Sequence, residues 1–187
     1  TILGDGDKPW LDEWRAGMGR ERADAETQRA ALRGTAVHSM IEKYLNNDPL
    51  PTLGHAPEHI PGFLMLRAVL NRVNNIITQE SALWSDTLRV AGRVDCIGEY
   101  QGKLAVIDFK TSTNDKSVHQ IGDYFLQTTA YALMFQELYG VQIDQIVIIM
   151  SVERGAVPLV FKQEVDPHIE PLIQRINTYH NNHRIIS

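Results

Sequence analysis

Hydrophobic and polar positions in the first part of the chain follow helical spacing. Alanines and long side chains dominate the stretch after residue 23 and Gly34 interrupts it, so the sequence predicts two helices, over 24–33 and 35–46. Clustered proline and glycine residues predict a loop over 47–61. Apolar positions three and four residues apart then predict a further helix over 62–78. This part of the chain is therefore expected to be mainly helical.

The second half of the chain changes to patterns typical of strands, with one long helical segment between them. The expected elements are strands over 88–100 and 103–111, a helix over 119–139 that Gly140 ends, strands over 145–152 and 157–165, and a helix after Pro167. The order of these elements predicts an α/β or α+β fold, with a mixed central β-sheet flanked by helices.

A length of 187 residues fits one domain with a single sizeable core. We expect a single domain over 1–187, in which a mainly helical segment, 1–80, precedes a sheet-centred core, 81–187. No apolar run approaches the ~20 residues that a membrane helix needs, so no membrane association is expected.

A Gln-Gly dipeptide at 101–102 is a turn signal between two predicted strands, and it fixes which residues oppose each other. With this dipeptide as the turn, Asp95 lies opposite Asp108, and Arg93 lies opposite Lys110. Side chains alternate along a strand, so Asp108 and Lys110 share a face. Two carboxylates and a lysine are therefore expected to converge on one patch of the sheet.

Like charges that oppose each other directly destabilise a sheet. A divalent cation bound by both Asp95 and Asp108 would neutralise this repulsion. The alternative is that both are ordinary surface acids at a solvated hairpin tip. The apolar residues on either side of Asp108, at 105–107 and 109, favour a strand buried on at least one face and therefore a site.

His38 and Glu80 are candidates for further metal ligands. His38 shares a helix face with Glu42, so a solvated His–Glu pair is the alternative interpretation. A histidine nitrogen beside two carboxylates suits Mg²⁺ or Mn²⁺, and the oxygen-rich set argues against zinc. Glu80 lies just before the first predicted strand, where it either adds an acid to the site or only caps the turn.

Gln127 and Tyr131 lie four residues apart on the helix that follows the Lys110 strand. This helix is expected to pack on the sheet and could bring both side chains near a bound phosphate. Taken alone, the commoner arrangement is a half-buried Tyr131 and an exposed Gln127.

The formal net charge of −5 argues mildly against a protein that coats nucleic acid, but not against an enzyme that binds nucleic acid at one site. The candidate cations for phosphate contacts are Arg29, Arg33, Arg93, Lys110 and Lys116. Cys96 is the only cysteine, which excludes a disulfide and a four-thiolate iron–sulfur cluster within the chain. Cys96 is expected on the opposite face of the sheet from Asp95, in the core.

Four ordered motifs carry a resemblance to a known family: G-T-A-V-H at 34–38, G-R-V-D at 92–95, I-D-F-K-T at 107–111 and Q-T-T-A-Y at 127–131. In this set the chain resembles the PD-(D/E)xK nuclease superfamily, in its RecB-like exonuclease branch. The arrangement of Leu11, Trp14, the alanines at 23 and 30 and the R-G-T-x-x-H motif is also similar to that of mitochondrial genome maintenance exonucleases and their phage relatives.

The resemblance implies roles for individual residues. His38, Asp95 and Asp108 would bind metal together with the backbone carbonyl of Phe109, and Lys110 would position or activate the attacking water. Gln127 and Tyr131 would hold DNA or orient Lys110. Glu80 corresponds less clearly to an acidic position of some members. Relatives with an iron–sulfur cluster hold it with four cysteines, so this chain is expected to lack one.

The function expected from these observations is a metal-dependent DNA exonuclease that acts on single-stranded ends. An endonuclease of restriction or repair type and a non-catalytic DNA-binding module are the alternatives, and the intact Asp95, Asp108 and Lys110 set argues against the module. A helicase or recombination protein is a plausible partner without support in the sequence. The expected compartment is the cytoplasm, bacterial or phage-like, or the mitochondrial matrix if a transit segment has been removed.

Overall fold

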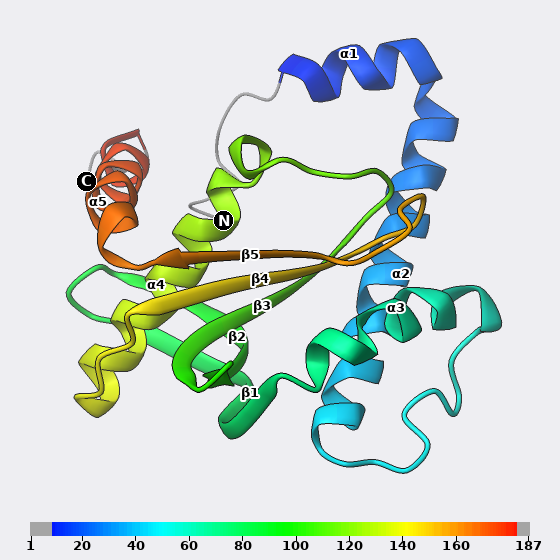
Figure 1. Ribbon diagram of the computed structural model, residues 1–187. Helices are drawn as coiled ribbons and strands as arrows, with labels where there is room; N and C mark the ends of the chain where they lie inside the picture. Colours follow the sequence, from blue (N-terminus) through cyan, green and yellow to red (C-terminus); the bar gives the residue numbers. More distant parts are fainter. Residues whose placement is uncertain (1–8, 183–187) are drawn as a thin grey trace.

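A mixed five-stranded sheet forms the centre of the structure, a computed structural model that describes residues 9–182 (Figure 1). Its strands lie side by side in the order of the chain, and only β3 and β4 run parallel. The strands are β1 (Val73–Ser85), β2 (Val90–Tyr100), β3 (Lys103–Ser112), β4 (Gln145–Val152) and β5 (Leu159–Glu164).

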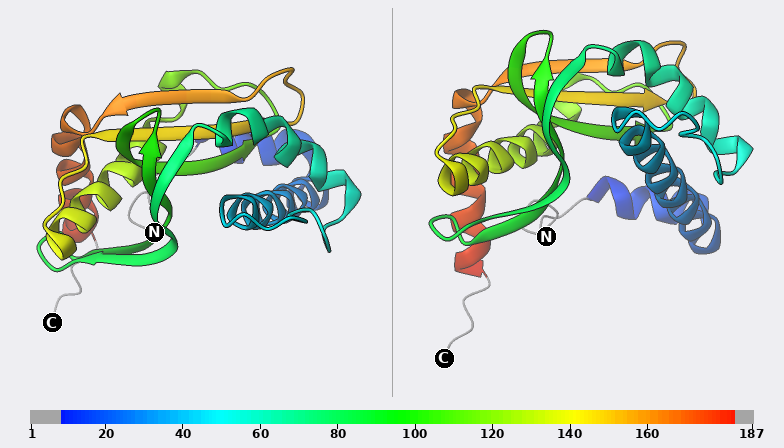
Figure 2. Two further views of the ribbon diagram at one scale, coloured as in Figure 1. Left: turned by 60° about the horizontal axis from the view of Figure 1, so that its bottom comes forward. Right: turned by 90° about the horizontal axis from the view of Figure 1, so that it is seen from below.

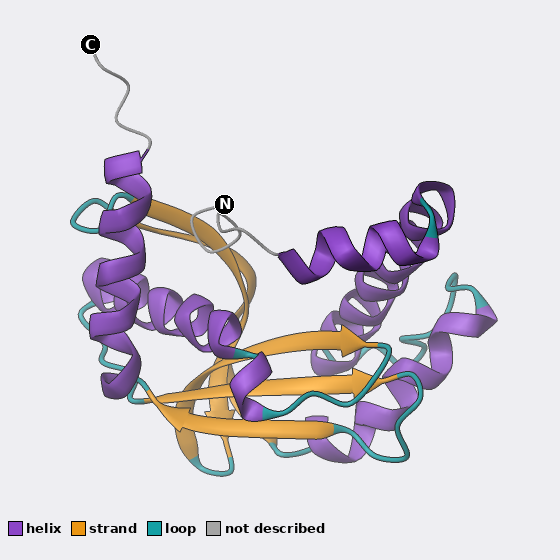
Figure 3. Cartoon of the chain, turned by 90° about the horizontal axis from the view of Figure 1, so that it is seen from above, coloured by secondary structure: helices purple, strands orange, loops and turns teal. Residues whose placement is uncertain are grey.

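Helices cover both faces of this sheet. Helices α2 and α3 lie together on one side, and α4 and α5 lie on the other (Figures 2 and 3). The α-helices are α1 (Pro9–Met18), α2 (Arg20–Leu45), α3 (Ile60–Leu70), α4 (Gly122–Tyr139) and α5 (Asp166–Asn182), and the 3₁₀ turns are η1 (Pro57–His59) and η2 (Val118–Gln120). The predicted fold, a mixed sheet flanked by helices with helical N-terminal elements, is confirmed.

Each face of the sheet has its own apolar core. On the α4 and α5 side, Val106 of β3 and Ile148 of β4 pack with apolar residues of both helices. On the α2 and α3 side, Ile107 and Ile149 from the same two strands pack with Met40 of α2. A strand buried on both faces has no polar positions to alternate, which explains the continuous apolar run of β4. No helix within residues 9–182 is long and apolar enough to cross a membrane.

The predicted hairpin register is confirmed where β2 and β3 pair. Tyr100 opposes Lys103 and Cys96 opposes Ile107, with the Gln-Gly turn between the strands. Both turn residues have positive φ angles, 54° and 82°. Positive φ at both central positions is the type I′ geometry, whose twist matches that of the flanking strands. Cys96 is buried in the core, as predicted, and lies on the side of the sheet that α2 and α3 cover.

The sheet forks one residue beyond the last β2–β3 pair. From Asp95 back to Val90, strand β2 continues to pair only with β1, whereas β3 continues to pair with β4 as far as Ser112. The free end of the β1–β2 hairpin lies beside α4 (Figure 1). Consequently neither Asp95 and Asp108 nor Arg93 and Lys110 form a strand pair, and this part of the predicted register is wrong.

Two predicted helix boundaries are wrong. Helix α2 runs through Gly34 without a break. A Cβ atom at Gly34 would lie 3.6 Å from Thr111 Oγ1, so the helix passes close to the end of β3 at this residue. Packing against the sheet thus outweighs the ~1 kcal/mol that a glycine costs inside a helix.

The helix predicted over 62–78 ends at Leu70, and β1 begins at Val73. Apolar residues at 73, 76 and 77 fit helical spacing, but they are β-branched and lie in β1, where Val73 pairs with Tyr100 of β2. Strand β1 was therefore missed, and it begins inside the segment expected to be mainly helical. Glu80 lies within β1 rather than before the first strand.

Candidate active site

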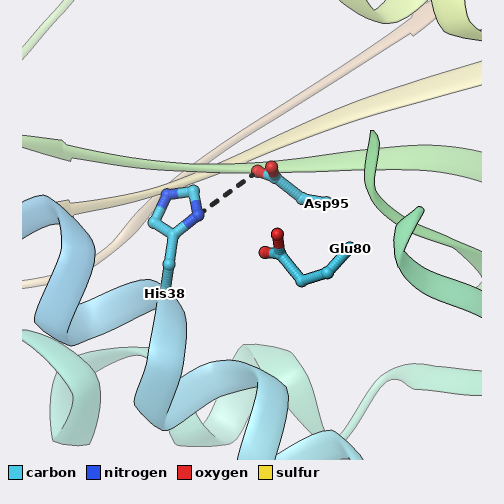
Figure 4. Close-up of side chains that lie close together, drawn as sticks. All are labelled: His38, Glu80 and Asp95. Atoms are coloured by element: carbon cyan, nitrogen blue, oxygen red, sulfur yellow. Dashed lines mark ion pairs between the residues drawn. The ribbon is translucent and has the colours of Figure 1, made fainter. Parts of the chain in front are cut away.

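Three side chains from three elements meet at the fork of the sheet. His38 comes from α2, Glu80 from β1 and Asp95 from β2, and one ligand atom of each lies within 4.8 Å of the other two (Figure 4). His38 Nδ1 lies 3.7 Å from Asp95 Oδ2. We call these three residues the candidate ligand group.

The backbone at Glu80 is unusual for a strand. Its φ of 49° lies in the left-handed region, which costs a residue other than glycine about 1–3 kcal/mol. The neighbouring pairs, Gln79 with Cys96 and Ser81 with Val94, place Glu80 opposite Asp95. Arg93 Nε donates to the Glu80 carbonyl at 3.0 Å and lies 2.8 Å from Glu80 Oε2. These contacts hold the Glu80 carboxylate on the side of the hairpin that faces His38 (Figure 4).

The side chain of Asp95 takes the place of a backbone hydrogen-bond acceptor for strand β3. Asp95 Oδ2 accepts a hydrogen bond from the backbone N–H of Phe109 at 2.8 Å, at the point where regular β2–β3 pairing has ended. The ring of His38 lies edge-on to the Phe109 ring, with the ring centres 6.3 Å apart. Phe109 therefore connects the histidine and the carboxylate of the candidate ligand group.

Burial sets the protonation of this group. Burial lowers the pKa of His38, although the Asp108 carboxylate opposes the shift. Burial, followed by repulsion from Asp108, raises the pKa of Asp95 to about 8. A neutral imidazole offers a lone pair to a cation, and a nearby cation would stabilise the charged form of Asp95.

Asp108 and Lys110 form an ion pair on one face of β3, as their spacing predicted. Lys110 Nζ donates to Asp108 Oδ1 at 2.9 Å and lies 2.7 Å from Oδ2. Burial raises the pKa of Asp108, against the opposing effect of Lys110. For Lys110 burial acts to lower the pKa, but the Asp108 carboxylate outweighs it and the pKa is raised. Lys110 therefore carries its proton at neutral pH.

Side chains of helix α4 contact the ammonium of Lys110. Lys110 Nζ donates to Gln127 Oε1 at 3.3 Å, and Gln127 Nε2 donates to Tyr131 Oη at 3.1 Å. The ammonium also lies 5.1 Å from the centre of the Tyr124 ring, within the range of a cation–π contact. Gln127 and Tyr131 are thus linked to Lys110, and neither is a detached surface group.

The donor chemistry of this region fits a divalent cation. The candidate ligand group offers one imidazole nitrogen and two carboxylates, a set suited to Mg²⁺ or Mn²⁺. Asp108 Oδ2 is buried and has no well-aligned hydrogen-bond donor within residues 9–182, although the lysine ammonium is near. Buried carboxylates with incomplete hydrogen bonding are costly unless a positive charge compensates them.

The structure brings together most of the predicted site residues, but Glu80 takes the place expected for Asp108 beside His38 and Asp95. Glu80, for which a turn-capping role was equally plausible, joins His38 and Asp95. Asp108 forms an ion pair with Lys110 instead, and it lies outside the candidate ligand group. Spacing within one hairpin predicted the Asp95–Asp108 neighbourhood but not the contribution of β1.

The predicted DNA-contacting cations do not share one location. Arg33 is buried and forms an ion pair with Glu153 and a 3.3 Å hydrogen bond to Thr113 Oγ1, so it fastens α2 to the sheet. Arg29 lies 2.7 Å from the same Glu153 carboxylate. Lys116 lies in the loop between β3 and η2. Arg93 is the cation bound to the candidate ligand group.

Two residues near the site were given no role by sequence reasoning. Tyr124 lies seven residues before Tyr131, on the α4 surface that faces Lys110, a spacing that could have identified it. Gly92 packs against Tyr131: a Cβ atom there would lie 2.8 Å from Tyr131 Cε1 and 3.0 Å from its hydroxyl. No side chain fits at Gly92 without moving the tyrosine.

Comparison with known proteins agrees with this geometry. Residues 62–176 match the model of the PD-(D/E)XK nuclease superfamily. Mitochondrial genome maintenance exonuclease 1 from Homo sapiens is 31% identical over 156 residues, which are 78% of this chain and 45% of the human protein. The Xenopus tropicalis protein of the same name is 31% identical over 79% of this chain and 44% of its own length. The chain thus spans less than half the length of these relatives.

A crystal structure of a protein from Eubacterium rectale, provisionally named an exonuclease, is also similar. It covers 83% of this chain and 76% of its own, at 9% identity and a TM-score of 0.47. The family match itself extends from the start of α3 into α5 and includes Glu80, Asp95, Asp108 and Lys110. The chain belongs to the PD-(D/E)XK nuclease superfamily.

Proposed function

We propose that this protein is a metal-dependent DNA exonuclease that hydrolyses phosphodiester bonds from single-stranded ends. The observation that carries the proposal is the meeting of the candidate ligand group with the Asp108–Lys110 pair at one fork of the sheet. Nucleases of this superfamily use divalent metal ions, and the donor set suits Mg²⁺ or Mn²⁺.

His38, Glu80 and Asp95 would hold the cation, with Asp108 and the Phe109 carbonyl as further candidate ligands. When bound, a divalent cation supplies Lewis-acid polarisation of a phosphoryl oxygen and makes a coordinated water more acidic. Arg93 holds the Glu80 carboxylate, and the Phe109 N–H holds that of Asp95. The protein therefore fixes these oxygens in place before the substrate arrives.

Lys110 would act by charge rather than as a general base. Its raised pKa keeps the ammonium protonated, so Nζ can donate hydrogen bonds but cannot accept the proton of the attacking water. A fixed ammonium stabilises the negative charge that grows on the phosphoryl oxygens as the water oxygen bonds to phosphorus and the bond to the leaving oxygen breaks. Asp108, Gln127 and the Tyr124 ring hold the ammonium in position.

Contacts with the DNA backbone are assigned to Arg93 and Lys116, whereas Gln127 and the buried Tyr131 would orient Lys110. Arg33, predicted as a further contact, is omitted because it is buried in its ion pair with Glu153. The exonuclease activity is favoured by the names of the curated relatives, and the endonuclease alternative uses the same site. A helicase or recombination partner stays a prediction, as does the compartment: bacterial or phage-like cytoplasm, or the mitochondrial matrix.

Linear and circular single-stranded DNA of one sequence separate the alternatives. With Mg²⁺ or Mn²⁺, we expect degradation of the linear strand and survival of the circle, because an exonuclease cannot start without an end. Nicking of the circle would identify an endonuclease. Survival of both substrates would indicate a non-catalytic module. The Lys110→Ala variant, purified in parallel, shows whether any degradation comes from a contaminating nuclease.

A further inference from the structure

A strip of exposed side chains leads away from the candidate ligand group along the free end of the β1–β2 hairpin. Trp84 opposes Ala91, and Ala82 opposes Arg93. Directly opposed residues of antiparallel strands share a face, and all four of these residues are exposed. We call this surface the Trp84 strip; it consists of Ala82, Trp84, Ala91 and Arg93.

The opposite face of the same hairpin end is packed against α4. Leu83 and Val94 are buried in the core that contains the α4 side chains, and Gly92 lies against Tyr131. Ser85 Oγ donates to Glu137 Oε2 of α4 at 2.5 Å. Because the hairpin is fastened on this face, the Trp84 strip is held facing outward.

Trp84 is not required to fill a core. Its residue surface is 49% exposed, while its strand neighbours Leu83 and Ser85 are almost fully buried. The side chains next to it on the strip, Ala82 and Ala91, end at Cβ, so neither is long enough to cover the indole. An exposed tryptophan between alanines on a firmly held strand is a rigid aromatic platform.

The strip joins this platform to the candidate ligand group through a cation. Both contacts of Arg93 with Glu80 use Nε, and 67% of the Arg93 side chain is exposed. Glu80 and Trp84 are four residues apart on β1, or roughly 13 Å at ~3.3 Å per residue. About four stacked nucleotides, at ~3.4 Å each, span that length.

We propose that Trp84 stacks on an unpaired base of a single-stranded DNA substrate, a few nucleotides from the scissile phosphate, while Arg93 contacts the intervening backbone. This inference rests on the proposed function, since it takes the candidate ligand group as the place of cleavage. Aromatic platforms beside cations are the general means of holding single strands. A duplex keeps the faces of its bases stacked inside, so the platform selects single strands.

Equilibrium binding of a short fluorescent oligothymidylate and of a matched duplex tests this proposal. The measurements use a Lys110→Ala background, in which the oligonucleotide is checked for integrity on a gel. Trp84→Ala should weaken binding of the single strand roughly tenfold or more, the scale of losing one stacked base, and should change duplex binding little. Trp84→Phe should recover most of the affinity. Tyr139→Ala removes a 60% exposed aromatic of α4 and serves as the matched control.

An abasic site moved along the oligonucleotide gives a second readout that a structural role of Trp84 would not change. With Trp84 present, one abasic position should weaken binding more than its neighbours. In Trp84→Ala that position should cost no more than the others, because the base and the indole then no longer interact.

Four results would overturn the proposal. Trp84→Ala could bind the single strand as tightly as its parent, or weaken single strand and duplex equally. The abasic profile could be unchanged in the variant. Trp84→Ala could change only the sedimentation of the protein, which would make Trp84 a protein contact. If Trp84→Ala selectively weakens binding but wild-type protein with Mg²⁺ leaves DNA intact, then the proposed nuclease activity fails and the stacking platform stands.

Discussion

The ammonium of Lys110 and the carboxylate of Asp108 form a buried ion pair on one strand, with Nζ 2.7 Å from Oδ2. The two residues depend on each other: the carboxylate keeps the lysine charged, and the lysine is the cation nearest to a carboxylate that has almost no contact with solvent. Any change to one partner therefore affects both the chemistry and the stability of the fold.

Lys110→Ala should depress single-turnover cleavage by roughly 10²-fold or more, the scale of losing one preorganised electrostatic contact. It should also lower stability, because removing one partner of a buried ion pair costs about 3–5 kcal/mol unless the remaining group is neutralised. Adding Asp108→Asn should restore much of the stability, measured by denaturant unfolding, without restoring cleavage. Lys110→Arg should rescue poorly, since the planar guanidinium is bulkier. Cleavage by Lys110→Ala at the wild-type rate would refute the proposed role.

Metal-free protein should lose stability as the pH rises toward 8. The folded-state pKa of Asp95, about 8, lies above its ordinary value of 3.8, so the folded protein holds a proton that the unfolded chain releases. The contribution of this group is therefore fully present below about pH 4 and is lost as pH rises through the window to 8. Asp95→Asn should reduce this slope in EDTA and be more stable than the parent at pH 8. Equal slopes for the two proteins, measured by thermal unfolding, would contradict the assignment.

Divalent cations should stabilise the folded protein by binding at the candidate ligand group. At a concentration of 100 times Kd, ligand binding adds about 2.7 kcal/mol to the free energy of unfolding. Mg²⁺ or Mn²⁺ should raise the melting temperature, and EDTA should reverse the rise and abolish cleavage. His38→Ala should shrink the rise while leaving the metal-free protein folded, whereas the exposed His119→Ala should behave as wild type. An unfolded His38→Ala variant would make this histidine structural.

Gly92→Ala should damage the site without touching any candidate ligand. The new Cβ would lie 2.8 Å from a ring atom of the buried Tyr131, so the ring must move and its contact with Gln127 is disturbed. We expect a loss of roughly 1–3 kcal/mol in stability, typical of overpacking, together with reduced cleavage. Gly122→Ala is the control, because nothing lies within 4 Å of a Cβ at that position. Wild-type stability and rate in Gly92→Ala would show that Tyr131 adjusts freely.

Local sequence patterns predicted those elements whose spacing of apolar residues fits either a helix or a strand, but not both. The β4 run, the α4 helix ending at Gly140 and the β2–β3 register all follow from periodicity and turn chemistry. Strand β1 was missed because its apolar residues also fit helical spacing. A register shift between Asn74 and Thr78, with left-handed φ angles at Asn75 and Glu80, hides its alternation.

The site was predicted only in part, because local patterns reveal only those of its residues that lie on regular strands. Asp95, Asp108 and Lys110 lie on one hairpin, so their neighbourhood follows from strand register alone. The contribution of Glu80 depends on an irregular strand, and the position of His38 depends on how α2 docks on the sheet. Arg33 illustrates the limit: its helix and its charge suggested a DNA contact, but burial against Glu153 is decided by tertiary packing.

The Gln-Gly turn at 101–102 sets the register of the β2–β3 hairpin. Gln101 is fixed from both sides, by its N–H bonded to the Arg72 carbonyl and by its side-chain Oε1, which accepts from Lys162 Nζ at 2.8 Å. Surface turns usually tolerate insertions. Here one added residue that slipped the register of β3 against β2 would turn Asp108 and Lys110 to the other face of the sheet, away from Asp95. This turn contains no chemical group of the site, but its length sets the relative positions of the site residues. A change in turn length alone should therefore abolish the proposed activity.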